Sequence, residues 1–213
     1  MSNVISERDA ATMLKMQPAK DDEWGGLFGT KLFCGKKRDY EESCRTSKRG
    51  VAEMDMKKRA VGVVLASIRA VLVVFGLLNE SHFEDAASLL LSLPGAPKQN
   101  HHHDFADWLP GGHLFKQPRK ADGTLPYALS VLIALEDGAS WVVWKKGEKE
   151  KKIMIPRLGA VIFRGDLRHA GDAYHVRNVR FHIYYGVKGE KGEVILAAPR
   201  DKKGAVSVVH AGT

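Results

Sequence analysis

Cysteine is scarce in this chain of 213 residues, which contains only Cys34 and Cys44. Two thiols cannot form the disulfide framework of a small secreted domain, and no second close pair accompanies them to complete a zinc site. The first residues also lack the basic and then apolar pattern of a secretion signal. The sequence therefore predicts free thiols in an intracellular protein, cytoplasmic in the first instance and nuclear as the alternative.

A long uninterrupted hydrophobic run is missing as well. The nearest approach is residues 60–78, "AVGVVLASIRAVLVVFGLL", and Arg69 stands at its centre. A charged side chain at the middle of a membrane helix costs about 2.5–3.5 kcal/mol on insertion scales. We therefore expect no membrane span, but a core helix with Arg69 on its polar side, or a helix that runs into a strand.

Charge of one sign is not concentrated in any one segment. The net charge of +8 would suit nucleic acid or another anionic partner. The lysines, however, are interleaved with acids, as in "KKRDYEES" (residues 36–43) and "KKGEKEKK" (residues 145–152). Mixed runs of this kind are typical of solvated helix faces and hairpin tips, so basicity alone does not identify a partner.

The segments that are present change in character near residue 80. Residues 1–80 are typical of a helical and irregular support region, with Ser6 as the N-cap of one helix and a second helix predicted across residues 51–74. Residues 81–213 contain short apolar runs separated by Pro and Gly, including "SVLIAL", "SWVVW", "AVIFRG" and "VRFHIYYGV". Such runs indicate an antiparallel barrel or sandwich. We expect a mainly β protein with N-terminal helices (α+β), forming one structural unit overall.

Three consecutive histidines precede an aspartate in "QNHHHDF", residues 99–105. If this segment is extended, side chains alternate between two faces, so that His102 and Asp104 point one way and His101 and His103 the other. His102 and Asp104 could then hold one metal ion together. A lone His-x-Asp pair carries little information, and a polar loop or a tag-like run remain the alternatives.

A third candidate ligand lies in "FRGDLRHAGDAYHVRNVRFHIYY". His169 follows the apolar run "AVIFRG" and is predicted at the end of that strand, before a glycine-containing turn. Arg180 opens the next strand, on which Arg180, His182 and Tyr184 share one face. Two histidines and one carboxylate form the facial triad of non-haem Fe(II) oxygenases, which leaves three positions open on an octahedral ion. A fixed guanidinium such as Arg180 could pair with the distal carboxylate of a 2-oxo acid.

With "HHD" at residues 102–104, "HAG" at 169–171 and "NVRFHIY" at 178–184, the sequence resembles the Fe(II)/2-oxoglutarate-dependent dioxygenases over about residues 87–187. The resemblance implies a double-stranded β-helix (jelly-roll) core formed by residues 81–213. It implies that His102, Asp104 and His169 are the catalytic iron ligands and that Arg180 binds the 5-carboxylate of 2-oxoglutarate. Fe(II), 2-oxoglutarate and O₂ are the implied cofactor and cosubstrates, with ascorbate as an optional addition. The implied reaction hydroxylates or demethylates a substrate and releases succinate and CO₂.

The resemblance does not extend to the prime substrate. The Arg-x-Asn-x-x-x-x-x-Arg arrangement of the nucleic-acid demethylases is missing, since Arg177 and Arg180 stand too close together. The tryptophan or acidic pattern of the prolyl hydroxylases is not evident around His169 either. A protein side chain or a small molecule is therefore favoured over nucleic acid as the partner.

Two further features concern the predicted site. Along residues 126–135, Ser130 and Tyr127 are candidates to bind 2-oxoglutarate, but they have opposite parity, so a regular strand allows only one of them. Residues 106–126 form a long irregular segment of the kind that often makes a lid, with Trp108, Leu109 and Arg119 as candidate substrate contacts.

Two other functions remain open. One is a cupin-like β-barrel that uses the same metal ligands without a 2-oxo acid. The other is a non-catalytic jelly roll that binds a partner through its basic tails. Arg180 distinguishes the oxygenase from the cupin-like barrel, because only the oxygenase requires a partner for a distal carboxylate.

Overall fold

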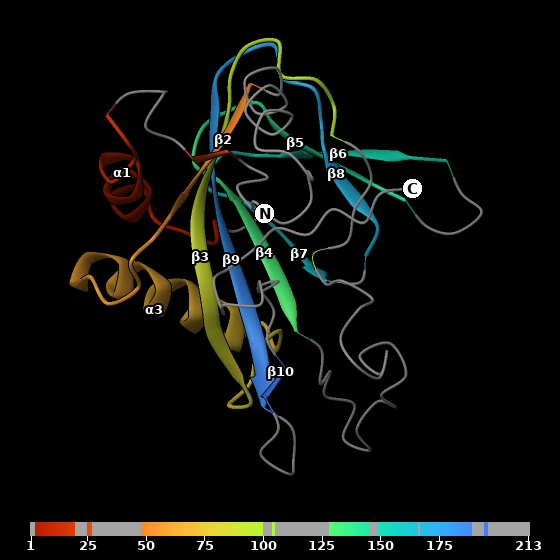
Figure 1. Cartoon of the computed structure of the whole chain (residues 1–213). Helices are drawn as coiled ribbons and strands as arrows, with labels where there is room; N and C mark the ends of the chain where they lie inside the picture. The colour runs from red at the N-terminus through yellow and green to blue at the C-terminus, as the bar shows by residue number, and fades with distance from the viewer. Residues whose placement is uncertain are drawn as a thin grey trace, which may run out of the picture.

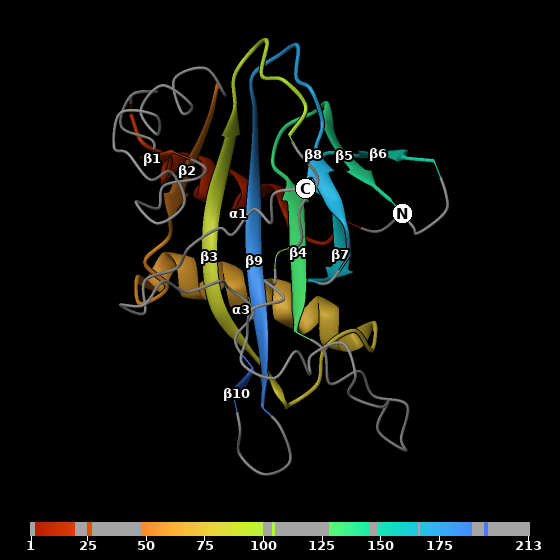
Figure 2. The same cartoon turned by 45° about the vertical axis from the view of Figure 1, so that its right-hand side comes forward.

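Two helices cover one face of a large antiparallel sheet, and a smaller sheet packs against part of its other face (Figures 1 and 2). The computed structural model describes residues 3–19, 25–26, 48–99, 104, 128–144, 149–165, 167–188 and 194–195. The helices are α1 (Glu7–Lys15) and α3 (Arg59–Val74). In Figure 2, α3 runs across β3, β9 and β4 of the large sheet.

The large sheet has seven strands in the order β1-β2-β3-β9-β4-β7, and β10 pairs with β9 beside this path. The small sheet has the order β6-β5-β8. All the pairings are antiparallel. The strands are β1 (Gly25–Gly26), β2 (Arg49–Glu53), β3 (His82–Ser92), β4 (Leu129–Ala134), β5 (Ala139–Val143), β6 (Lys151–Ile155), β7 (Ala160–Arg164), β8 (His169–Gly171), β9 (Asn178–Lys188) and β10 (Val194–Ile195).

The first helix begins where the sequence predicts. The Ser6 side chain accepts a hydrogen bond from the backbone N–H of Asp9 at 3.1 Å, which satisfies one of the free donors in the first turn of α1. Ala10 and Met13, one turn apart, are buried against the large sheet. The helix thus contributes an apolar stripe to the core.

The apolar run around Arg69 is a core helix, as expected. Arg69 lies at the edge of the buried stripe of α3, half-buried, with its guanidinium 3.4 Å from the Glu84 carboxylate. It also donates to the carbonyl oxygens of Asn79 and His82, so its charge is well solvated by polar atoms. In the described residues, no helix combines the length and the apolar character that crossing a bilayer requires.

The helix predicted over residues 51–74 is correct only from residue 59 onward. Residues 51–53 belong to β2, which pairs with β3 in the register Val51↔Leu90. The segment "VAEMDM" has no helical start signal, and the edge of the large sheet offers ladder hydrogen bonds that an isolated helical turn lacks. Among the described residues, the region before residue 80 therefore supplies the strands β1 and β2 of the large sheet as well as the helices α1 and α3.

Strand alternation separates two kinds of surface on the large sheet. The main core, between this sheet and the helices, takes one side of each central strand: Leu89 and Leu91 of β3, Val131 and Ile133 of β4, and Val179, Phe181, Ile183 and Tyr185 of β9. The opposite side faces the small sheet and is part apolar, part polar. Its apolar part is a second cluster of Leu132, Ala134 and Phe163 with Ala139, Trp141 and Ile155. The polar residues of this inner face form the candidate site.

Candidate active site

The strand β9 presents three polar side chains on its inner face. Arg180, His182 and Tyr184 alternate with the residues that enter the main core, as the sequence predicts. All three are buried. Strand β9 is the central element of the site because it lies between β3 and β4 in the large sheet.

Asp104 and His169, two of the predicted metal ligands, lie together. The Nε2 atom of His169 is 3.5 Å from Oδ1 of Asp104, and the side chains are 5% and 2% exposed. Metal–ligand bonds to imidazole and carboxylate are about 2 Å long, so two donor atoms at this separation can share one ion. The backbone N–H of Asp104 donates to the carbonyl of Gly165 at 3.0 Å, which fixes the aspartate beside the end of β7.

The second ring nitrogen of His169 is held by the backbone. Its Nδ1 is 2.8 Å from the carbonyl oxygen of Leu167, an acceptor, so Nδ1 carries a proton. That hydrogen bond turns Nε2 toward Asp104, and it is the kind of outer contact that orients metal-binding histidines. The rings of Trp141 and Phe163 enclose the imidazole, with ring centroids 5.3 Å and 4.7 Å from that of His169.

The sequence suggested that His169 lies at the end of the strand "AVIFRG", and the structure shows that it does not. Strand β7 ends at Arg164 in the large sheet, and His169 begins the short strand β8 in the small sheet. There His169 pairs with Val143 of β5. The chain changes sheets between the two strands, a crossing that local periodicity does not reveal.

The electrostatic surroundings distinguish the two buried histidines. Burial acts to lower the pKa of His169, but the charge and hydrogen bond of Asp104, with the Leu167 carbonyl, raise this pKa above its ordinary value. Asp104 thus favours a proton on Nε2, the position that a metal ion would take in its place. The pKa of His182 falls to about 4, chiefly through burial, with His169 and Arg180 adding to the effect. His182 is therefore neutral at neutral pH.

Ser130 lies on the inner face of β4, the face on which the sequence predicted it. Its hydroxyl oxygen is 2.5 Å from Oδ2 of Asp104. Since an ionised carboxylate can only accept, Ser130 donates its proton to Asp104 and orients the carboxylate. Its predicted role toward 2-oxoglutarate remains a prediction.

His182 is a site residue whose importance the sequence did not reveal. Its Nε2 lies 3.7 Å from Oδ2 of Asp104 and is fully buried without a hydrogen-bond partner among the described residues. Its ring packs against that of Tyr184, with centroids 4.3 Å apart. The only signal in the sequence was its parity with Arg180, which placed it on the inner face.

Other predicted site residues lie outside the described residues. These are His102 and Tyr127, together with the predicted lid of residues 106–126 and its candidate contacts Trp108, Leu109 and Arg119. The described residues alone do not complete a set of three metal-ligating side chains. Asp104 and His169 supply two donors of the kind that a ferrous ion takes, and His102 remains the predicted third.

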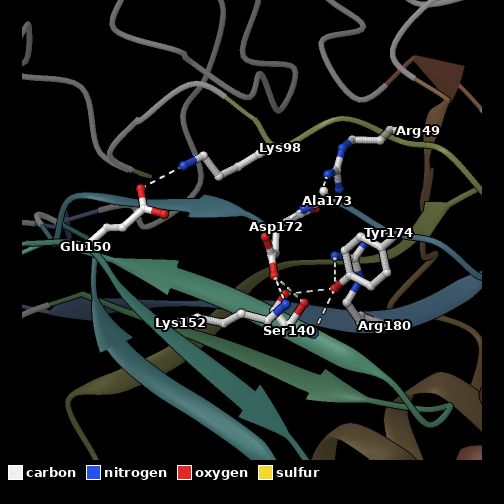
Figure 3. Close-up of polar contacts among 9 residues, drawn as sticks. All are labelled: Arg49, Lys98, Ser140, Glu150, Lys152, Asp172, Ala173, Tyr174 and Arg180. Atoms are coloured by element: carbon white, nitrogen blue, oxygen red, sulfur yellow. Dashed lines mark hydrogen bonds and ion pairs between the residues drawn. The ribbon is translucent and has the colours of Figure 1, made fainter.

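Arg180 is buried and is held by neutral groups. Its Nη1 donates to the hydroxyl of Tyr174 at 2.9 Å and its Nη2 to the hydroxyl of Ser92 at 2.6 Å, while its guanidinium carbon lies 4.6 Å from the centre of the Tyr174 ring. Figure 3 shows the guanidinium stacked on that ring. Its Nε is buried and has no partner in the described part of the chain. Among the described residues this buried cation has no anionic contact, an arrangement that suits the distal carboxylate of a dicarboxylic acid.

A second buried arginine, Arg49, was not foreseen. It comes from β2, outside the segment in which the sequence resembles the oxygenases. Only its contacts in the structure show that it lies beside the site. It donates to Ser92 at 2.8 Å and to the carbonyl oxygens of Pro97 at 2.7 Å and Asp172 at 2.5 Å. Burial and the neighbouring Arg180 lower the pKa of Arg49 to about 10. It stays charged at neutral pH.

The Asp172 side chain is directed away from both arginines. Its carboxylate contacts the hydroxyl of Ser140 at 2.9 Å and the ammonium of Lys152 at 2.5 Å (Figure 3). Only the backbone carbonyl of Asp172 reaches Arg49. Within the described residues, the two guanidiniums therefore have no direct carboxylate contact.

Comparison of the sequence with protein-family models finds no match, and comparison with curated proteins finds none either. The structure, in contrast, is similar to many solved structures. HygX from Streptomyces hygroscopicus, solved with nickel and 2-oxoglutarate bound, aligns with a TM-score of 0.62 at 11% identity, over 99% of this chain and 90% of its own.

Two prolyl hydroxylases give similar alignments. The prolyl-4-hydroxylase of Pseudomonas putida has a TM-score of 0.53 at 13% identity, over 89% of this chain and 91% of its own. The viral collagen prolyl hydroxylase of Paramecium Bursaria Chlorella virus-1, a 2-oxoglutarate complex, has a TM-score of 0.52 at 9% identity, over 87% and 92%. At this level of identity the likeness concerns the fold. The chain therefore has the double-stranded β-helix fold of the Fe(II)/2-oxoglutarate oxygenases, as the sequence resemblance implied.

Proposed function

We propose that the protein is an Fe(II)- and 2-oxoglutarate-dependent oxygenase that hydroxylates or oxidatively demethylates a C–H-bearing substrate. One observation carries the proposal. A buried Asp–His pair with donor atoms 3.5 Å apart joins the small sheet to the inner face of the large sheet, and the same inner face carries Arg180, a buried arginine with no carboxylate contact among the described residues. A metal site alone requires only the pair, whereas a dicarboxylic cosubstrate explains the arginine as well.

In this proposal Asp104 and His169, with His102, hold the ion. Ser130 keeps the Asp104 carboxylate in one orientation, and the Leu167 carbonyl keeps Nε2 of His169 directed at the ion. Arg180 binds the 5-carboxylate of 2-oxoglutarate and so sets the orientation of the cosubstrate. When bound, the iron with 2-oxoglutarate and O₂ supplies an oxidant strong enough for a C–H bond, and succinate and CO₂ are released.

The chain also limits the access of water to the site. Trp141 of β5 and Phe163 of β7 pack against each other, with ring centroids 4.6 Å apart, and both contact the His169 imidazole. A low-polarity wall of this kind excludes water that would otherwise consume a reactive oxidant. It also strengthens the electrostatic contacts of the ligands.

The test is iron-dependent release of succinate from 2-oxoglutarate without a prime substrate, since such turnover needs only the metal, the oxo acid and O₂. We expect slow release by the wild-type protein and its loss in His169→Ala. In Arg180→Met the half-saturating 2-oxoglutarate concentration should rise about tenfold or more, because a charge-assisted contact is lost. A folded wild-type protein that binds iron but never releases succinate would favour a cupin-like metal barrel.

A further inference from the structure

The outer face of α3 is almost entirely apolar. After Arg59, the exposed residues of this helix are uncharged: Ala60, Val63, Ala66, Ser67, Ala70, Val73 and Val74. The other helix on this side of the large sheet, α1, exposes the charged residues Glu7, Arg8 and Lys15. A helix on the surface of a globular protein normally turns a charged or polar face to solvent, and α3 lacks such a face.

The exposed side chains of α3 form one continuous stripe. Val63, Ala66, Ala70, Val73 and Leu77 follow one another at alternating intervals of three and four residues, the spacing at which two packed helices contact each other. The stripe lies on the opposite side of α3 from its buried residues, which are Val61, Val64, Leu65, Ile68 and Leu72. Figure 1 shows α3 on the side of the large sheet away from the small sheet, so the stripe is remote from the candidate active site.

The C-terminal end of the stripe is held in a fixed turn. Gly76 has a φ of 68°, and the backbone N–H groups of Gly76 and Leu77 donate to the carbonyl oxygens of Val73 and Leu72, both at 2.9 Å. This is a Schellman cap, in which glycine adopts the left-handed conformation without strain. Val74 and Leu77, which are 84% and 42% exposed, are therefore presented to solvent by a hydrogen-bonded backbone.

The charges at the N-terminal end of α3 oppose the helix dipole. Lys57, Lys58 and Arg59 are exposed there, and the first turn contains no acid. The nearest acid, Asp55, precedes them and accepts a hydrogen bond from the backbone N–H of Lys57 at 3.0 Å. Because the N-terminus of a helix carries a partial positive charge, three basic side chains beside it are unfavourable in an isolated helix.

The C-terminal end of α3 has the complementary charge. Its last turn contains no basic residue, and Glu80 is exposed shortly after the helix ends. In the described part of the chain, neither Glu80 nor the basic residues 57–59 form an ion pair. Each end of the helix thus carries a charge that the other end would attract.

A second copy of α3 in antiparallel orientation satisfies the stripe and the charges together. With a two-fold axis between Ala66 and Ala70, Val63 of each copy faces Val73 of the other, and the two alanines allow the helices to approach closely. The same arrangement brings Lys57 of each copy to the end of the other helix, near Glu80. A two-fold axis repeats every contact, so opposite charges meet at both ends of the interface.

We infer that the outer face of α3 is the interface of a homodimer in which two copies of this chain pack α3 against α3 in antiparallel orientation. The acid at one end of the stripe favours a second copy over a lipid surface, which attracts stripes bordered by basic residues. The inference goes beyond the proposed function and is independent of it, because the contact involves neither the metal ligands nor Arg180.

The size of the stripe determines how tight the dimer should be. The stripe and its flanks present on the order of 500 Å² per copy, so a symmetric pair buries about 1,000 Å², the lower limit for a specific interface. We therefore expect an equilibrium between monomer and dimer with a dissociation constant on the order of 1–100 μM. Sedimentation velocity of the full chain over a range of concentrations measures this constant, without metal or 2-oxoglutarate.

The first variant places a charge on the stripe. Val63→Lys should weaken dimerisation about tenfold or more, because two unpaired charges would be buried in each dimer. Lysine has a higher helix propensity than valine, so α3 should remain folded, which circular dichroism verifies. Val176→Lys is the matched control, since Val176 is 57% exposed and Val63 is 55% exposed, but Val176 lies between β8 and β9. Its dissociation constant should change less than twofold.

Charge reversal tests the orientation. Lys57→Glu and Glu80→Lys should each weaken dimerisation about fivefold, because an exposed ion pair is replaced by two like charges at both ends of the interface. The double variant Lys57→Glu/Glu80→Lys should restore most of the wild-type affinity, because it restores opposite charges. A double variant that binds no better than the single ones would overturn the antiparallel pairing.

Two other results would overturn the inference as a whole. One is a wild-type chain that remains monomeric at about 500 μM, well above the expected dissociation constant. If this monomer instead cosediments with phosphatidylcholine vesicles, the stripe belongs to a lipid surface. The other is an equal dissociation constant for Val63→Lys and Val176→Lys, which would place any dimer contact elsewhere on the molecule. Neither result bears on the oxygenase proposal, which is tested by succinate release.

Discussion

Nε2 of His169 faces Oδ1 of Asp104 across 3.5 Å, in a contact that joins the two sheets of the molecule. His169 belongs to the small sheet through β8, whereas Asp104 is held by Ser130 of the large sheet. The candidate metal site therefore forms only when the two sheets pack together. Its ability to bind an ion depends on tertiary packing as much as on the identity of the ligands.

The Ser130→Ala variant should bind metal more weakly. Ser130 donates to the Asp104 oxygen that does not face His169, and loss of such an outer contact typically costs about 10–100-fold in metal affinity. Calorimetric titration of the protein with Co(II) measures this affinity. The control is Ser140→Ala, which removes a buried hydroxyl that contacts Asp172 instead. Equal affinities for the two variants would contradict the assigned role of Ser130.

Removal of the hydroxyl group should lower the free energy of unfolding at Tyr174 but not at Tyr185. The Tyr174 oxygen accepts from Arg180 and from the Ser140 N–H, and donates to the Ser140 carbonyl. Tyr174→Phe leaves these groups unsatisfied, so its free energy of unfolding should fall by about 1–3 kcal/mol.

The Tyr185 hydroxyl, in contrast, is buried without a partner among the described residues. Tyr185→Phe removes a desolvated polar atom and should leave the free energy of unfolding unchanged or raise it. Urea unfolding of both variants provides the comparison. A larger loss in Tyr185→Phe than in Tyr174→Phe would show that the hydrogen-bond assignment is wrong.

Phe181 should be among the most costly core residues to truncate. It is fully buried between β9 and the helices, so Phe181→Ala should lower the free energy of unfolding by about 3–5 kcal/mol. Phe75→Ala is the matched control, because Phe75 ends α3 with more than half of its surface exposed. Its effect should stay within about 0.5 kcal/mol. Thermal and urea unfolding measure both, and similar losses would contradict the assigned core.

Stability should decrease in acid in part through Asp172. Burial tends to raise the pKa of Asp172, but Lys152, Ser140 and the N–H of Ala173 lower it below the ordinary value of 3.8. A carboxyl group with a lowered pKa in the folded state stabilises the protein above the unfolded-state value. This contribution is lost as the pH falls from about 4 through the folded-state pKa.

The Asp172→Asn variant should therefore lose less stability than the wild type when the pH is lowered from 5 to about 2. Unfolding midpoints across this range provide the measurement. Glu150→Gln, which breaks only the exposed ion pair with Lys98, serves as a control. An acid profile of Asp172→Asn that matches that of the wild type would exclude this carboxylate as a source of the pH dependence.

Much of the site could be predicted because strand alternation is local. The period of two placed Arg180, His182 and Tyr184 on one face, and placed Ser130 on the inner face of its strand, before any contact was known. The charge of Arg69 in the apolar run of residues 60–78 likewise predicted a core helix with Arg69 on its polar side, rather than a membrane span. These features depend only on residues that are close together in the chain, so they can be predicted from the sequence.

Features that depend on distant neighbours were decided by the tertiary structure. Residues 51–53 have no strong secondary-structure preference of their own. They form a strand because they pair with β3 in the large sheet. His169 changed sheets because β5 was available to pair with it. Arg49 became part of the site only because β2, β3 and β9 lie side by side and Gly171 leaves room for its guanidinium.

The sequence by itself determined which side chains share a face, since backbone geometry repeats locally. Which faces meet was decided by the packing of the two sheets, where burial and hydrogen bonding join residues far apart in the chain.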